Sequence, residues 1–147
     1  MPEILYLDYN CFQRGFDDQR QVRIRLEADA CDGIFHDAEN GAVELVWSFM
    51  HADENALCPF PDRKIEVGRL AGICTVFVKP GMAIRKRAKE LVSSAGVSPK
   101  DALHLAASEH AKAAWFVTCD DELVRKAKGL TIAPRIVNPV HYVMLKR

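Results

Sequence analysis

Residues 98–121, SPKDALHLAASEHAKAAWFVTCDD, decide the fold, because a helix, an apolar strand and a pair of acids follow one another there without a break. Ser98 is placed as an N-cap, Pro99 stands at the first helical position, and Asp101 follows three residues after the cap. This pattern marks the start of a helix. The run 114–118 then predicts a buried strand, so the segment contains a helix that leads into a strand.

Short β-rich runs alternate with stretches of helical period along the rest of the chain. This alternation is typical of a parallel sheet covered by helices. Five runs are predicted as strands: ILYLD (4–8), VELVWS (43–48), CTVFVK (74–79), AWFVT (114–118) and PRIVNP (134–139). We therefore expect an α/β fold with a central, mainly parallel sheet of about five strands.

The segments between these runs carry helix signals. Residues 48–58 and 63–72 predict two short helices, and residues 82–95 predict a longer one that stops at Gly96. Residues 18–37 predict an amphipathic helix whose apolar face is Val22, Leu26, Ala30 and Ile34.

The composition is that of an ordinary globular domain. The 147 residues are 49% hydrophobic and 27% charged, which predicts one domain over residues 1–147 with a single sizeable core. The 20 basic and 20 acidic residues cancel, so a nucleic-acid partner needs a local basic patch. Candidates are Lys79 with Arg85, Lys86, Arg87 and Lys89, and also Arg14, Arg20, Arg23, Arg63 and Lys64.

Cysteine usage and the N-terminus indicate the compartment. The five cysteines form no CxxC pair or metal-ligand pattern, so they are interpreted as reduced thiols that fill the core. The N-terminus lacks a basic leader, and no stretch approaches the roughly 20 apolar residues of a membrane span. We expect a cytoplasmic protein without a membrane partner.

Acids from four distant segments fall near predicted strand ends. Ligands of open parallel sheets bind outside the carboxyl ends of the strands. Asp8 ends the first run, Ser48 and the helix with Glu54 follow the second, Asp120 follows the fourth, and Asp101 opens the helix before it. We therefore expect these four carboxylates to share one crevice.

Such a group of acids needs a cation. Two carboxylates a few ångströms apart repel by about 4 kcal/mol at an effective dielectric near 20. Oxygen ligands without histidine or cysteine suit Mg²⁺ or Mn²⁺ rather than zinc. Such ions bind substrate phosphates and activate water, so the predicted chemistry is phosphodiester hydrolysis.

Two of these acids also have structural explanations. Asp101 can complete a capping box with Ser98. Thr118 or Asp120 can cap the helix DELVRKAK, whose first turn then holds Asp121 and Glu122.

The other two acids have alternatives as well. Asp53 can take the role of Glu54, which otherwise lies on an apolar stripe where a charge needs a partner or an ion. Asp8 can serve as a turn residue that bonds the backbone of Asn10 or Cys11. His104 shares a helical face with Asp101, although a lone helical histidine is more often structural.

Four motifs together resemble the PIN-domain family of metal-dependent nucleases. They are LDYN (7–10), Ser48 with Glu54 six residues later, PKDALHLAA (99–107) and FVTCDD (116–121), which cover essentially the whole chain in the family's order. The chain differs from common patterns at Tyr9, where a small Thr or Ser often stands, and in the adjacent pairs Asp53/Glu54 and Asp120/Asp121.

The resemblance implies a three-layer α/β/α fold and an acidic pocket with one or two Mg²⁺ or Mn²⁺ ions. It implies Asp8, Glu54, Asp101 and Asp120 as catalytic metal ligands, with polar support from Asn10, Ser48 and Thr118. Asp53 and Asp121 remain alternative ligands. Many bacterial members resemble VapC-type toxins, which are ribonucleases inhibited by a small antitoxin protein.

The predicted function is a metal-dependent endoribonuclease acting on single-stranded RNA, with a toxin–antitoxin pair and a homodimer as further expectations. One alternative is a non-catalytic module that binds RNA or a protein partner. The other is Mg²⁺-dependent phosphotransfer through an aspartyl phosphate on Asp8.

Overall fold

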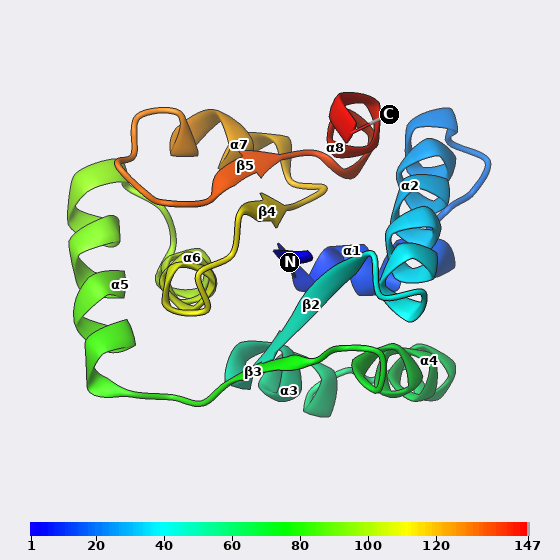
Figure 1. The fold of residues 1–147 in the computed structure, drawn as a ribbon, viewed down its shortest axis with the longest axis horizontal. Coiled ribbons are helices and arrows are strands. Elements are labelled where there is room, and N and C mark those ends of the chain that lie inside the picture. The colour runs from blue at the N-terminus through cyan, green and yellow to red at the C-terminus, as the bar shows by residue number, and fades with distance from the viewer. Residues whose placement is uncertain (147) are drawn as a thin grey trace.

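Five parallel strands form one sheet at the centre of the molecule (Figure 1). The computed structural model describes residues 1–146. The strand order is β3-β2-β1-β4-β5, and the strands are β1 (Glu3–Leu7), β2 (Val43–Ser48), β3 (Val76–Val78), β4 (Trp115–Val117) and β5 (Arg135–Val137). All five predicted strands are confirmed, and β2 has the predicted bounds.

The helices start and stop at the signals in the sequence. Ser48 caps α3, Ser98 caps α6, and Gly96 ends α5 in the left-handed conformation at φ 66°. The helical elements are α1 (Tyr9–Gln13), the 3₁₀ helix η1 (Arg14–Phe16), α2 (Val22–Glu39), α3 (Phe49–Ala56), α4 (Pro61–Ala71), α5 (Met82–Ala95), α6 (Pro99–His110), α7 (Asp121–Ala127) and α8 (Pro139–Lys146).

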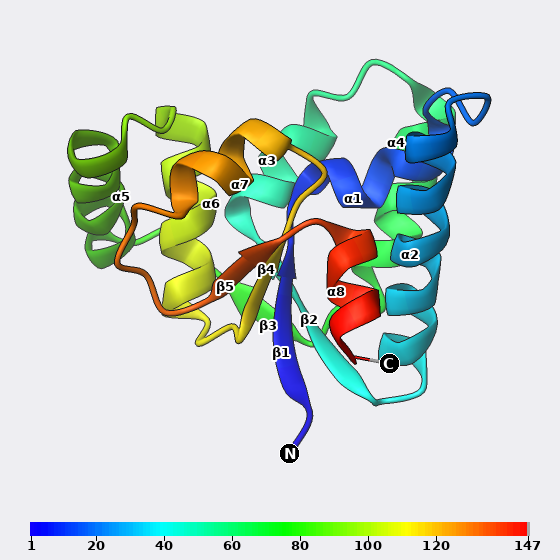
Figure 2. The same cartoon turned by 90° about the horizontal axis from the view of Figure 1, so that it is seen from above.

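Alternating side chains of the strands build a core on each face of the sheet. Leu5 and Leu7 point into a cluster shared with α1, α2, α4 and α8, whereas Tyr6 points into a cluster shared with α5, α6 and α7. Figure 2 shows these two sets of helices on opposite sides of the sheet. The fold is therefore a three-layer α/β/α sandwich.

The predicted apolar face of α2 is wrong in its first half. Val22 is 59% exposed and Leu26 51% exposed, whereas Glu27 is only 1% exposed. The buried face carries a charge because Arg14 donates to Glu27 over 2.6 Å and Arg23 pairs with the same carboxylate. The two residues of the Arg14–Glu27 ion pair are 13 positions apart in the sequence. Apolar periodicity therefore does not reveal which face of this helix is buried.

The strand order creates a switch point between β1 and β4. The chain runs from β1 outward to β2 and β3, then returns to place β4 on the other side of β1. Crevices in open α/β sheets form at such points, outside the carboxyl ends of the strands. Within residues 1–146, no helix combines the length and the apolar character that crossing a membrane requires.

Candidate active site

Asp8 occupies the switch point directly after β1. It is 8% exposed, its backbone N–H donates to the Val117 carbonyl at the end of β4 (2.8 Å), and it is the N-cap of α1. Its Oδ1 accepts from the Tyr9 backbone N–H at 2.7 Å, and its Oδ2 accepts from Thr118 Oγ1 at 2.8 Å and from Asn10 Nδ2 at 3.4 Å. The carboxylate is thus held in one orientation by groups from α1 and from the loop that follows β4.

The pKa of Asp8 is raised above its ordinary value. Burial is the main cause, and the charges of Asp101 and Glu54 raise it further, against the opposing effects of His104 and Thr118. Asp8 therefore lies close enough to both acids to interact with them electrostatically.

Asp101 and Asp120 form the other side of the cluster. Asp101 lies in the first turn of α6, where its backbone N–H donates to Ser98 Oγ at 3.1 Å. Burial raises the pKa of Asp101, and the charge of Asp120 adds to this effect. Asp120 caps α7 and accepts from the N–H groups of Glu122 and Leu123 at 3.0 and 3.2 Å. The capping roles proposed for Ser98 and Asp120 are therefore present, and both helix starts place an acid beside the switch point.

Glu54 belongs to α3, and its carboxylate contacts the side chains of Lys100 and His104. It forms an ion pair with Lys100 Nζ at 3.2 Å and a short hydrogen bond with His104 Nε2. Burial alone would raise the pKa of Glu54, but His104 and Lys100 bring it below its usual value. The carboxylate therefore stays ionised, in keeping with the expectation that a charge on this stripe needs a partner.

The two alternative acids, Asp53 and Asp121, are exposed, as Asp120 also is. Asp121 pairs with Arg23 of α2. The Tyr9 side chain is buried, and its hydroxyl donates to Asn55 Oδ1 at 2.9 Å, which ties α1 to the helix that carries Glu54. The unusual residue at position 9 thus has a bracing contact beside the site.

A series of hydrogen bonds between buried side chains lies behind Glu54 and was not predicted from the sequence. His104 Nδ1 lies 2.6 Å from the Tyr6 hydroxyl, which lies 2.8 Å from Ser48 Oγ, and Ser48 Oγ lies 2.9 Å from His51 Nδ1. His51 Nε2 donates to the Leu7 carbonyl at 2.7 Å, and burial followed by the His104 charge lowers the pKa of His51 to about 3.

The sequence contained one signal for this series of buried hydrogen bonds. His51 stands three residues after Ser48, the spacing of a capping box, and its ring does complete that box by accepting from the Ser48 backbone N–H at 3.0 Å. The Tyr6–His104 contact spans 98 residues and has no local signature.

Most of the predicted phosphate-binding arginines are engaged by acids. Arg14 pairs with Asp17 and Glu27, Arg63 pairs with Asp17, and Arg87 pairs with Glu90 and Glu109. Lys100, 62% exposed, contacts Glu54 of the cluster directly.

The donor chemistry of the cluster fits a hard divalent cation. Its members offer oxygen atoms, and like charges raise the pKa of both Asp8 and Asp101, a repulsion that a cation relieves. Among the described residues, three cysteines form the one group of three potential ligands with atoms within 4.8 Å of one another, so no three of the acids approach so closely. Water in the coordination shell, which Mg²⁺ usually retains, suits this wider spacing.

A family model of the PIN domain matches residues 62–129 of this chain. The match confirms the resemblance that the motifs indicate, over a shorter range than the motifs suggest: it includes Asp101 and Asp120, whereas Asp8 and Glu54 precede it. PIN domains are generally nucleases and typically use divalent metals. A search of curated proteins gives no match.

Proposed function

We propose that this chain, whose α/β/α fold carries the PIN-domain match, is a metal-dependent endoribonuclease that hydrolyses phosphodiester bonds of single-stranded RNA. The observation that carries the proposal is the setting of Asp8. This acid is buried at the switch point, and its pKa is raised mainly by that burial and further by the charges of Asp101 and Glu54. Burying a carboxylate costs free energy, and a bound cation would compensate that cost.

Asp8, Asp101 and Asp120 would hold Mg²⁺ or Mn²⁺, with Glu54 at the α3 side. When bound, such an ion lowers the pKa of water and stabilises negative charge on phosphoryl oxygens. The protein's own contribution is positioning: Thr118 and Asn10 fix the Asp8 carboxylate, and Ser98 fixes the start of α6 beneath Asp101.

His104 and Lys100 contact the Glu54 carboxylate from opposite sides. His104 is 1% exposed, so it holds Glu54 from the protein side, while Lys100 reaches the same carboxylate from the solvent side. Lys100 is therefore placed to meet the phosphate of an RNA strand that binds beside Glu54.

The direct test is cleavage of a labelled single-stranded RNA with and without Mg²⁺ or Mn²⁺. Asp8→Asn and Asp101→Asn should each lower the rate by about a hundredfold or more, because each removes a charged ligand. Asp53→Asn and Asp121→Asn are the control variants, since Asp53 lies on the exposed side of α3 and Asp121 pairs with Arg23. Cleavage that persists in the Asp8 variant, or that needs no divalent ion, contradicts the proposal.

We also propose that the nuclease acts as the toxin of a toxin–antitoxin pair, a role supported by the resemblance to VapC-like PIN nucleases. Induced expression should then arrest growth, and Asp101→Asn should relieve the arrest. Co-expression with a small protein encoded next to this chain should restore growth to cells that carry the unaltered sequence. Normal growth under induction of an active enzyme would remove the toxin role and leave the nuclease.

The two alternative functions give different results in the same material. A non-catalytic module binds RNA without cleaving it, and Asp8→Asn leaves that binding intact. A phosphotransfer protein takes up beryllium fluoride at Asp8, whereas a nuclease does not.

A further inference from the structure

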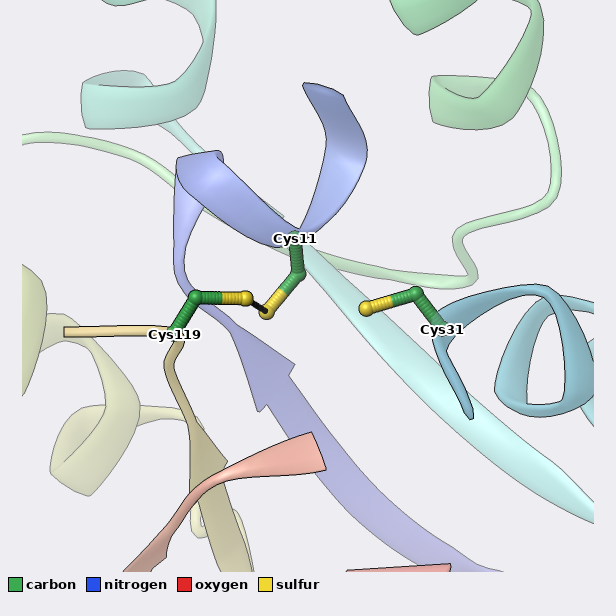
Figure 3. A group of neighbouring side chains, drawn as sticks. All are labelled: Cys11, Cys31 and Cys119. Carbon is green, nitrogen blue, oxygen red and sulfur yellow. Dashed lines mark hydrogen bonds between the residues drawn. The ribbon is translucent and has the colours of Figure 1, made fainter. Parts of the chain in front are cut away.

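Three of the five cysteines meet at one point, although they come from distant segments. Cys11 lies in α1, Cys31 in α2, and Cys119 in the loop between β4 and α7. Their sulfur atoms all lie within 4.8 Å of one another, and the Cys11 and Cys119 sulfurs are 4.0 Å apart. Figure 3 shows the three side chains pointing toward a common centre. The expectation that the cysteines merely fill the core misses this arrangement.

The spacing matches a three-coordinate thiolate site. Sulfur ligands about 2.3 Å from a central ion lie about 4 Å apart when they form a trigonal plane. The Cys11–Cys119 pair has this separation already, and Cys31 needs to move by less than an ångström toward the centre. The cysteines are free thiols in the structure, so all three sulfurs remain available as ligands.

The other cysteines provide an internal comparison. Cys74 belongs to the same apolar cluster but follows α4 and donates to the Leu70 carbonyl of that helix, and Cys58 is only partly buried. Neither has two further thiols beside it among the described residues.

A pocket gives access to the cluster. It has a volume of about 520 Å³, lies between α1, α2 and α4, and is lined by Cys11 and Cys31. Asp32, His36, Glu39 and Glu66 also line it, so the approach is polar although the thiols are buried. A cation can therefore reach the sulfurs from solvent on the α2 side of the sheet.

We propose that Cys11, Cys31 and Cys119 form a binding site for a soft monovalent cation, Cu(I), held by three sulfurs. Soft thiolate ligands select Cu(I) and zinc over hard ions. Structural zinc sites are closed by four ligands, and here no histidine, aspartate, glutamate or further cysteine among residues 1–146 joins the three within 4.8 Å. The ion enters and stays as Cu(I), and each thiol that binds it releases its proton to the solvent.

The site is separate from the acidic cluster but adjoins it through Asn10. The Asn10 Oδ1 atom accepts from the Cys119 backbone N–H at 3.2 Å and from Cys11 Sγ at 3.5 Å, while its amide nitrogen donates to Asp8 and Thr118. The two sites would select different cations, because oxygen donors favour hard ions and sulfur donors favour soft ones.

The test is a titration of the full-length, reduced protein with Cu(I) delivered by a chromophoric chelator without oxygen. We expect one equivalent per chain, with a thiolate-to-copper charge-transfer band and three sulfur neighbours by X-ray absorption. Cys31→Ala and Cys119→Ala should each weaken binding at least tenfold, and Cys74→Ala should leave it unchanged. Thermal unfolding of each variant establishes that it is folded.

Several outcomes overturn the proposal: no 1:1 uptake by the unaltered protein, preferential uptake of Zn²⁺, fewer than three sulfur neighbours, or equal loss of affinity in Cys74→Ala. The titration and the absorption spectrum of the unaltered chain decide the matter even if a cysteine variant does not fold. Since no RNA is present, the result is independent of the proposed nuclease activity.

Discussion

Asp8 and Asp101 hold their protons more tightly in the folded chain than free carboxyl groups do, because burial and neighbouring acids raise both pKa values. Stability from such acids is fully present at low pH and is lost as pH rises from the ordinary carboxyl pKa through the raised one. At neutral pH, the metal-free protein therefore carries an electrostatic penalty at this site.

Asp101→Asn should accordingly raise the melting temperature of the metal-free protein at pH 7 while abolishing cleavage. Mg²⁺ should stabilise the unaltered protein and should have little effect on the variant, because ligands that bind only the folded state stabilise it. Differential scanning calorimetry with and without Mg²⁺ measures both effects. A lower melting temperature in Asp101→Asn than in the control Asp53→Asn would contradict the assignment.

Tyr6→Phe should destabilise the fold by about 1 to 3 kcal/mol, because it leaves buried His104 and Ser48 without the hydroxyl that joins them. Tyr142→Phe is the matched control: this tyrosine is also buried, but its hydroxyl makes no side-chain hydrogen bond within the described residues. Urea unfolding of the two variants compares them. Equal losses would mean that the hydroxyl chain contributes nothing beyond packing.

His51 should make stability fall as the solution is acidified below about pH 6.5. Its pKa drops from 6.5 to about 3 on folding, so within this window the unfolded chain binds a proton that the folded chain refuses. The slope is at most about 1.4 kcal/mol per pH unit. His51→Gln should flatten the pH dependence of the urea midpoint between pH 7 and 5; an unchanged slope assigns the effect to another group.

At the scale of single elements, Gly96 and Gly68 should respond to alanine in opposite directions. Gly96 ends α5 at φ 66°, where alanine is strained, so Gly96→Ala should cost about 1 kcal/mol. Gly68 lies inside α4 with open space around its Cβ position, so Gly68→Ala should stabilise by about 0.5 to 1 kcal/mol. Thermal melts of both variants check the signs, and a gain at Gly96 would show that α5 ends differently.

The elements that the sequence predicts well are those with local causes. The Ser98–Pro99 start and the Gly96 stop act within one turn, and the strands are continuous apolar runs. The buried face of α2 could not be predicted, because Glu27 is buried by Arg14 and Asn138, which lie 13 and 111 residues away. The short α1 and α8 also lacked an apolar period long enough to detect.

At the scale of the whole molecule, the parallel-sheet rule places the predicted acids near one edge before any coordinates are known. The electrostatic interactions that link Asp8 to Asp101 and Glu54, and Asp101 to Asp120, agree with that placement. The Tyr6–His104 contact and the three-thiol cluster depend instead on the rotation of helices against the sheet. Pattern and spacing along the chain carry no information about that rotation.

The strand order also sets the order in which the proposed catalytic edge can form during synthesis. One of the two neighbours of β1, β4, begins only at residue 115, and Thr118 and Asp120 follow it. Residues 115–120 must therefore leave the ribosome before β1 can gain its second neighbour and Asp120 can join the other acids. Under the proposed function, a fragment that ends before residue 115 should not cleave RNA, because it lacks this strand and one of the proposed ligands.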